Sequence, residues 1–253
     1  MAYKIETYED FILFTIDRQE KRNAVNGEVM KGLKEAVALS KEQDHVKFFV
    51  ITGSGDKAFC SGGDLSEFHR LKTEEQAFGM LSEMGAILYD LATLEIPTIA
   101  LVNGAAVGGG CEIATACDYR LVAGHAKCGF IQGTLAITSG WGGGTYLLER
   151  GLRHDYALKM LSDATTYDAR QLYEIGWATK LFDNSGERAL NEFIAKMRNL
   201  HPTVLRAYKE IQLRKWKESK MYNRVMEEIR LCAKLWESDV HHEAVNRFLN
   251  KSN

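Results

Sequence analysis

The chain has 253 residues, with 32 basic and 34 acidic side chains, a formal net charge of −2 and a pI near 6.4. This balance lacks the cationic excess of proteins that bind nucleic acids, so we expect no nucleic-acid partner. The five cysteines form no CxxC pair, which predicts reduced thiols in the cytoplasm. No apolar run is long enough to cross a bilayer, and we expect a soluble cytoplasmic protein without a membrane partner.

The order of apolar patterns along the chain predicts an α/β protein. Short runs with β-branched residues predict a first strand at 11–16 and further strands at 48–52, 98–102, 119–123 and 128–131. Apolar residues three and four apart predict helices at 26–43 and 73–94. After Gly186 only helical patterns follow, at about 187–200, from Pro202, at 220–236 and from about 240. We therefore expect a core domain over 1–186 and a C-terminal helical region over 187–253.

The stretch from Pro97 to Asp118, PTIALVNGAAVGGGCEIATACD, is the most informative one. It predicts a strand, a tight loop with glycines at 108–110, and a helix with Glu112 in its first turn. Glycines at a helix start aim free N–H groups at negative charge. A carboxylate beside them would repel a phosphate, but it suits a site where charge is transient and a proton must move. The alternative is a close-packed turn in which Glu112 only complements the helix dipole.

A second predicted strand also runs into glycines, in GSGDKAFCSGGDL at 53–65, ahead of a predicted helix at Leu65. Two such loops are able to lend one backbone N–H each to the same oxygen, which predicts an oxyanion hole. A third cluster, GWGGGT at 140–145, precedes an apolar segment. His241 and His242 have the wrong spacing for two ligands on one helical face, so we predict no metal site.

Three of these motifs resemble the enoyl-CoA hydratase/isomerase (crotonase) superfamily: AFCSGGDL at 58–65, the 97–118 stretch, and GGGT at 142–145. The similarity runs from KRNAV at 21–25 to FLNK at 248–251. It implies an α/β fold built as a spiral of ββα units, and a C-terminal helical region that forms a homotrimer or a dimer of trimers. It also implies an acyl-coenzyme A thioester as substrate. Coenzyme A would enter as part of that substrate, with no separate cofactor.

The resemblance also assigns site residues. The backbone N–H groups of Gly63 and Gly109 would hold the thioester oxygen as it becomes an enolate, and Glu112 would be the catalytic acid or base. Asp64 would cap the helix that follows it. The residues that would bind the substrate and its coenzyme A lie near these loops and at the C-terminus: Arg22, Ala24, Ser61, Gly62, Gly133, Trp141 and Lys251.

One departure from the family pattern bears on the reaction. Hydratases of the family carry a second glutamate, and counting back from GGGT places Gly133 at its position. No Asp or Glu occurs between Tyr119 and Leu148. Adding water requires that the water be deprotonated while the α-carbon receives a proton, and the family's hydratases share these tasks between two carboxylates. We therefore expect Glu112 to act as the single acid/base.

The sequence leaves the reaction open. The family name favours hydration or double-bond isomerisation. SGWGGGT at 139–145 is similar to the loop of family members that decarboxylate branched malonyl-CoA thioesters, where Trp141 would form an apolar wall beside the leaving carboxylate. Alternatively, Trp141 fills core space left by Gly133. A third hypothesis is a catalytically silent trimer that binds acyl-CoA.

Overall fold

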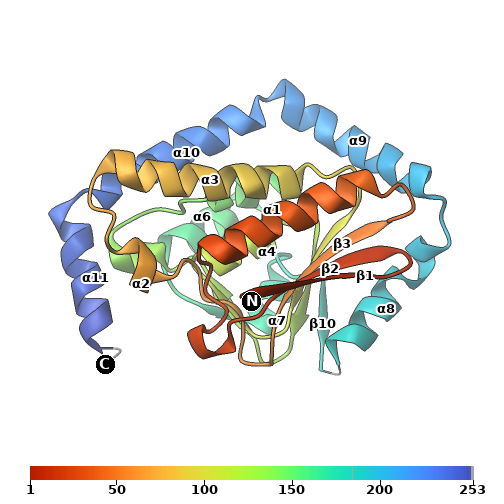
Figure 1. The fold of residues 1–253 in the computed structure, drawn as a ribbon, viewed down its shortest axis with the longest axis horizontal. Coiled ribbons are helices and arrows are strands. Elements are labelled where there is room, and N and C mark those ends of the chain that lie inside the picture. The colour runs from red at the N-terminus through yellow and green to blue at the C-terminus, as the bar shows by residue number, and fades with distance from the viewer. Residues whose placement is uncertain (184, 252–253) are drawn as a thin grey trace.

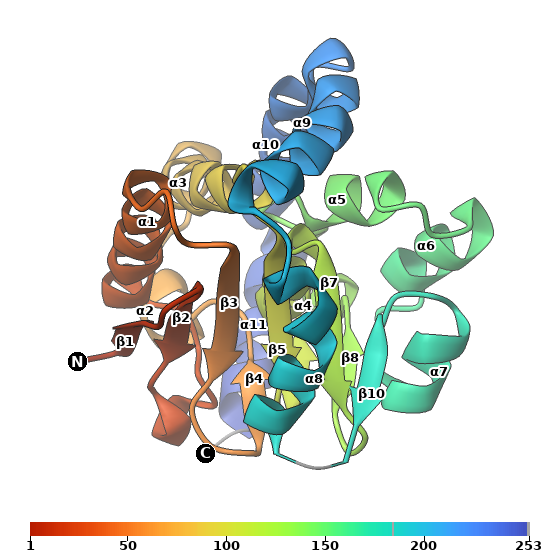
Figure 2. The same ribbon diagram turned by 90° about the vertical axis from the view of Figure 1, so that its right-hand side faces the viewer.

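The computed structural model describes residues 1–183 and 185–251, and the side chains of all of these except Lys251. Two sheets form its centre. The larger sheet has six strands, in the order β1 (Tyr3–Thr7), β2 (Phe11–Ile16), β3 (Phe48–Gly53), β5 (Thr98–Val102), β7 (Tyr119–Ala123) and β10 (Lys180–Phe182). The smaller sheet has four, in the order β4 (Ala58–Cys60), β6 (Ala105–Val107), β8 (Lys127–Gly129) and β9 (Tyr167–Asp168). In Figure 2 the strands of the larger sheet stand side by side, with α3, α9 and α10 above them.

Most neighbouring strands are parallel, which is why helices must connect them. The exceptions are the pairs β1–β2 and β8–β9, which are antiparallel. The helices of the first part of the chain are α1 (Gly27–Glu42), α2 (Leu65–Phe68), α3 (Glu74–Ala92), α4 (Gly109–Ala116), α5 (Gly143–Glu149), α6 (His154–Ser162) and α7 (Ala169–Glu174), with short 3-10 helices η1 (Gln19–Lys21) and η2 (Gln132–Leu135). The C-terminal ones are α8 (Gly186–Arg198), α9 (Pro202–Glu218), α10 (Met221–Trp236) and α11 (Asp239–Lys251).

These elements confirm the expected α/β class and the helical tail. The strands predicted at 11–16, 98–102 and 119–123 have the same bounds in the structure. The prediction that 11–16 is the first strand is wrong, because β1 precedes it as an edge strand whose residues are all exposed or only partly buried. The short strands β4, β6 and β10 escaped prediction, since three residues are too few to show a period.

The C-terminal helices pack on the rest of the chain as a layer of their own. Figure 1 shows α10 running alongside α3, and α11 descending past α2 at the left of the view. The contact places an isoleucine of α10, Ile229, where a side chain on Gly85 of α3 would otherwise lie. Within the described residues, no helix combines the length and the apolar character needed to cross a membrane. The division at residue 186 stays a prediction, although the later helices contribute to the site described below.

Helix α4 is buried along its whole length and carries Glu112. Two arginines cap its C-terminal end. Arg150 donates to the carbonyl oxygens of Thr115, at 3.3 Å, and of Ala116. Arg120 donates to the carbonyl oxygen of Cys117 at 2.7 Å. These carbonyls have no partner inside a helix, and positive charge there complements the helix dipole. Side chains therefore fix the end of α4 that lies opposite to its glycines.

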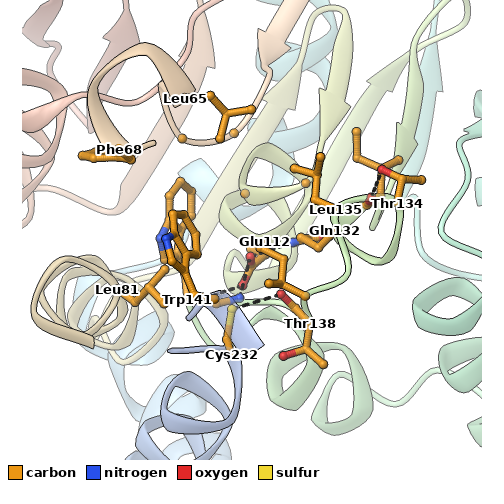
Figure 3. Close-up of a pocket in the computed structure, with 18 of the residues that line it drawn as sticks. Leu65, Phe68, Leu81, Glu112, Gln132, Thr134, Leu135, Thr138, Trp141 and Cys232 are labelled. Carbon is orange, nitrogen blue, oxygen red and sulfur yellow. Dashed lines mark hydrogen bonds between the residues drawn. The ribbon is translucent and has the colours of Figure 1, made fainter. Parts of the chain in front are cut away.

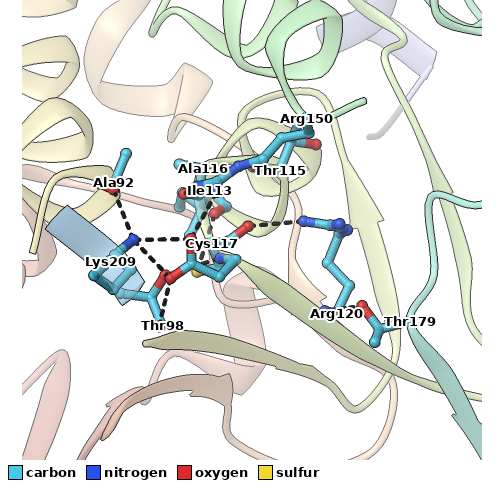
Figure 4. A network of polar contacts seen from close by, with 11 residues as sticks. Ala92, Thr98, Ile113, Thr115, Ala116, Cys117, Arg120, Arg150, Thr179 and Lys209 are labelled. Atoms are coloured by element: carbon cyan, nitrogen blue, oxygen red, sulfur yellow. Dashed lines mark hydrogen bonds and ion pairs between the residues drawn. The ribbon is translucent and has the colours of Figure 1, made fainter. Parts of the chain in front are cut away.

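Asp118 balances part of this positive charge. It accepts hydrogen bonds from Arg150 Nη1 at 2.6 Å and from Lys209 Nζ at 2.8 Å, and Figure 4 shows these cations gathered round the end of α4. Burial opposes the ionisation of Asp118, but Arg150 and Lys209 lower its pKa to about 2. Because Lys209 comes from α9, the network ties the C-terminal helices to α4.

Candidate active site

A cavity of about 130 Å³ lies where α2, α3, α4, η2, α10 and α11 meet. One end is formed by the two glycine loops, with Gly63 and Gly109 in its wall. Most of the other side chains that line it are apolar, among them Leu65, Phe68, Leu81, Leu135, Trp141 and Trp236 (Figure 3). Glu112 is the one acidic side chain in the wall among the described residues. The cavity therefore suits an apolar chain whose polar end meets the glycines.

The local backbone hydrogen bonds around Gly63 and Gly109 do not use the N–H groups of these two glycines. Gly63 lies on a one-residue parallel bridge with Val25, whose hydrogen bonds run from Val25 N to Gly62 O and from Asp64 N to Val25 O, both 2.8 Å. The N–H of Gly63 thus remains outside this bridge. Gly109 is the first residue of α4, so its N–H has no carbonyl partner within the helix. The two loops touch, since a Cβ on Gly62 would lie 3.1 Å from Gly109 N.

The indole of Trp141 covers these glycines. A Cβ on Gly109 would lie 2.1 Å from Cζ3 of the ring, and a Cβ on Gly63 would lie 3.5 Å from Cζ2. Trp141 is only 4% exposed. The ring is therefore an apolar wall beside the candidate oxyanion hole, the position that the resemblance of the 139–145 loop to that of decarboxylating family members implied for it. It does not fill space left by Gly133, because a side chain on that glycine would start towards Ala164, at 2.9 Å.

The Glu112 carboxylate accepts hydrogen bonds at all four of its usual positions. Oε1 accepts from Gln132 Nε2 at 2.8 Å and from Gly140 N at 3.2 Å, and Oε2 accepts from Trp141 N at 2.8 Å and from Gly143 N at 2.9 Å. A carboxylate offers about four lone-pair sites, so no acceptor is left for a water molecule in this arrangement. Figure 3 shows Glu112 between the cavity and the loop that donates to it.

The protonation of Glu112 is poised near neutrality. Burial raises its pKa to about 7, the nearby Glu228 carboxylate contributes to the rise, and the three backbone N–H groups oppose it. A group with such a pKa exists in both protonation states near pH 7, which is what proton transfer to or from a carbon requires. Glu112 therefore holds the loop at 140–143, and its raised pKa suits a group that exchanges a proton.

The residue beside Glu112 is Gln132 rather than Gly133. Gln132 lines the cavity and donates to Glu112, and its Oε1 is buried without a hydrogen-bond partner. Gly133 does not line the cavity. A Cβ on this glycine would point towards Ala164, which is not among the residues that line the cavity. The prediction that Gly133 takes the position of the second glutamate is therefore wrong by one residue. The residue beside Glu112 is thus an amide, and Glu112 is the one acidic side chain among the described residues that line the cavity. Its role as the single acid/base stays a prediction.

The other predicted binding residues lie at different distances from the cavity. Ser61 and Gly62 line it. Arg22 and Ala24 do not, although the N–H of Ser61 donates to the carbonyl of Arg22 at 3.1 Å, directly behind the wall. Lys251 ends α11, and its side chain lies outside those that the structure describes.

The capping role expected for Asp64 is confirmed, because its side chain accepts from Ser66 N at the start of α2.

Sequence reasoning missed the contribution of the C-terminal helices to the wall. Cys232 and Trp236 of α10 and Phe248 of α11 line the cavity. Each belongs to an amphipathic helical pattern, in which nothing distinguishes a residue that faces a cavity from one that faces the core. The packing of α10 along α3 brings Cys232 and Trp236 to the site, and the packing of α11 against η2 and α10 brings Phe248 there.

Comparisons with known proteins agree on one family. A family model described as Enoyl-CoA hydratase/isomerase matches residues 6–253. A crotonyl-CoA hydratase of Syntrophomonas wolfei is 36% identical over 185 residues, which cover 72% of this chain and 70% of the relative. An ethylmalonyl-CoA decarboxylase of Bos taurus is 30% identical over 239 residues, covering 93% of this chain and 77% of the relative. Across similar relatives, the aligned stretches span 53% to 77% of the relatives' own length.

The fold is found in solved structures. The crystal structure of an enoyl-CoA hydratase from Bacillus halodurans is similar with a TM-score of 0.88, over 98% of this chain and 100% of that one, at 17% sequence identity. At this identity the likeness speaks for the fold alone. It confirms the crotonase architecture with C-terminal helices.

Proposed function

Because this chain belongs to the enoyl-CoA hydratase/isomerase family, we propose that it is an enzyme that converts a coenzyme A thioester through an enolate. The observation that carries the proposal is the meeting of two glycine N–H groups, at Gly63 and Gly109, at one end of an apolar cavity that also contains Glu112. Two preorganised donors stabilise negative charge on the thioester oxygen where it develops, and removing one typically costs about 3 kcal/mol of activation free energy.

The cavity supports a short acyl group. Its volume of about 130 Å³ is close to that of an engineered cavity that holds benzene. We therefore propose an acyl chain of about four to six carbons. The apolar wall would exclude water from the reacting carbon, which strengthens the attraction between the enolate and its donors.

Among reactions that pass through an enolate, the site favours decarboxylation of a malonyl-type acyl-CoA over hydration. Hydration needs one group that deprotonates a water molecule and a second that protonates the α-carbon, whereas the side chain beside Glu112 is the amide of Gln132. Decarboxylation breaks the bond between the α-carbon and the carboxylate, and the electron pair moves into the enolate. The α-carbon then takes one proton, for which a protonated Glu112 is the donor. The Trp141 indole would desolvate the departing carboxylate.

One assay separates the hypotheses. The protein is incubated with ethylmalonyl-CoA, methylmalonyl-CoA and crotonyl-CoA, and products are separated by liquid chromatography. Loss of CO₂ from a malonyl ester, with hydration of crotonyl-CoA far below about 10 s⁻¹, is expected. Hydration of crotonyl-CoA at a rate typical of enzymes would show that the protein is a hydratase. Binding of all three esters without turnover would identify the silent acyl-CoA-binding protein, and failure to bind any of them would overturn the proposal.

A further inference from the structure

A second glutamate holds the loop that Glu112 holds, from the opposite side. Glu228 lies on α10, and its Oε1 accepts from Ser139 Oγ at 2.5 Å and from Gly144 N at 2.9 Å. Its Oε2 accepts from the backbone N of Thr145 at 2.7 Å and from Thr145 Oγ1 at 2.5 Å. Unlike Glu112, Glu228 does not line the cavity.

The two carboxylates divide the donors of one loop, residues 139–145, between them. Glu112 takes the N–H groups of residues 140, 141 and 143, and Glu228 takes those of residues 144 and 145. Residues 143–145 open α5, so both charges lie at a helix N-terminus, where negative charge is favourable. The glycines fit this arrangement closely. A Cβ on Gly143 would lie 2.4 Å from Glu112 Cγ, and one on Gly144 would lie 3.1 Å from Glu228 Oε1.

We propose that Glu228 is a positioning residue of the site. Glu228 fixes residues 144 and 145 from α10, and through them it holds residues 140–143 of the same loop. Trp141 then stays against Gly109, and the Glu112 carboxylate keeps its hydrogen bonds to the loop. The assembly of the cavity wall then depends on the C-terminal helical layer. The claim that this loop serves catalysis rests on the proposed function, but the coupling between the two glutamates is a property of the folded chain.

Glu228 and Glu112 are coupled by the repulsion between their charges as well as by their hydrogen bonds to the shared loop. The titratable groups that face Glu112 are Glu228 and Cys232 on α10, Tyr146 on α5, and Cys111 on α4 itself. Burial raises the pKa of both thiols and of the phenol, so these three groups are neutral near pH 7. Glu228 is thus the neighbour whose charge disfavours a second negative charge at Glu112, and it contributes to the raised pKa of that residue.

The test compares Glu228→Gln with Glu227→Gln in the full chain. Glu227 is the preceding residue of α10 and is exposed, so its substitution changes the net charge equally without touching the loop. The pKa of Glu112 is measured by carbon NMR of glutamate labelled at the side-chain carboxyl, with Glu112→Gln used to assign the signal. In Glu228→Gln the lost negative charge lowers the pKa of Glu112 and the loosened loop donors raise it, so a net fall of less than about 1 pH unit is expected, whereas Glu227→Gln should leave this pKa in place. An unchanged pKa in folded Glu228→Gln, together with unchanged hydrogen exchange at the N–H groups of Trp141 and Gly143, overturns the coupling.

Hydrogen exchange provides the second readout. The N–H groups of Trp141 and Gly143 bond to Glu112 and not to Glu228, so a faster exchange of these two in Glu228→Gln reports transmission through the loop. An increase of about tenfold is expected, the effect of one lost hydrogen bond.

If Glu228→Gln does not fold, Ser139→Ala decides, since it removes one bond to Glu228 and keeps the charge. Unchanged exchange at Trp141 and Gly143 in that variant overturns the proposal. Neither readout requires turnover, so failure of the proposed function would leave this result interpretable.

Discussion

The indole of Trp141 occupies the space that any side chain at Gly109 would need, with its Cζ3 atom 2.1 Å from the position of a Cβ on that glycine. The Trp141 ring therefore packs directly against the same glycine whose backbone N–H is proposed to face the cavity. A side chain at Gly109 would therefore force the ring or the backbone to shift. The pair links the two features on which the proposed chemistry depends, the donor and the desolvating wall.

We predict that Gly109→Ala displaces Trp141 and destabilises the protein by about 1–3 kcal/mol, the usual cost of overpacking. Adding Trp141→Ala should relieve the clash, so that the double variant loses less than the sum of the single ones. Urea unfolding of the four proteins measures this. Gly79→Ala is the control, because Gly79 is exposed on α3 and a Cβ there meets nothing within 4 Å. Additive losses from Gly109→Ala and Trp141→Ala would show that the two residues do not share this space.

Glu112 should make the protein less stable as the pH rises. Its pKa of about 7 in the folded chain lies above the ordinary value of 4.5, so folding favours the protonated form. The resulting stabilisation is fully present below pH 4.5 and is lost as the pH rises through 7, in total about 3 kcal/mol. Glu112→Gln removes this dependence, so the stability of the variant relative to wild type should increase between pH 5 and pH 8. Unfolding in urea across that range gives the slope, and parallel curves for the two proteins would refute the raised pKa.

Asp118 should act in the opposite direction and at lower pH. Its pKa of about 2 lies below the ordinary 3.8, so its contribution to stability is present above pH 3.8 and is lost as the pH falls towards 2. Asp118→Asn leaves Arg150 and Lys209 buried without their partner and should cost about 3 kcal/mol or more at pH 7. This deficit should narrow by about 2 kcal/mol between pH 5 and pH 2.

The control for Asp118 is Asp90→Asn, which removes an exposed pair with Lys41 and should cost less than about 1 kcal/mol at either pH. A similar loss in both variants would mean that the network at the end of α4 contributes no more than a surface ion pair.

Gln132→Glu should introduce hydration of crotonyl-CoA. The new carboxylate would lie beside Glu112, and two carboxylates this close share a proton, which provides one acid and one base. The rise over wild type should be on the order of 10²-fold, typical of an added general base. Gly133→Glu is the control, since its side chain would start towards Ala164 and away from the cavity. Loss of enoyl-thioester absorbance is the assay. An equal rise in both variants would show that position 132 has no special relation to Glu112.

The sequence predicted those parts of the fold that have a local cause. The run at 98–102 and the glycines at 108–110 each fix their own backbone, and the structure confirms a strand and a glycine-led helix start there. β1 was missed because its alternation includes charged residues on an exposed edge. Counting back from the GGGT motif led to Gly133 and not to Gln132, which contacts Glu112. Residues 132–135 form the short 3-10 helix η2, and a count along the sequence does not tell which of its side chains points towards Glu112.

Glu228 had no local signal at all. It is one of two glutamates on an amphipathic helix, and the other, Glu227 beside it, has the same chemistry and is exposed. What distinguishes the two is the direction in which α10 packs against α3 and α5, which is a tertiary property. The glycines at 143 and 144 were visible in the sequence, but the carboxylates that require them come from residues 112 and 228, far away along the chain.

Exchange of the α-protons of butyryl-CoA with D₂O tests enolate formation at Gly63 and Gly109 most directly. In the proposed decarboxylation of ethylmalonyl-CoA, the last step protonates the enolate to give butyryl-CoA, and the reverse of this step removes an α-proton and returns a deuteron from D₂O. We predict that wild type and Glu227→Gln deplete the α-proton NMR signal, and that Glu112→Gln, which cannot take up the proton, preserves it while still binding the ester. A wild-type protein that binds butyryl-CoA by calorimetry and leaves its α-proton signal intact would contradict the account.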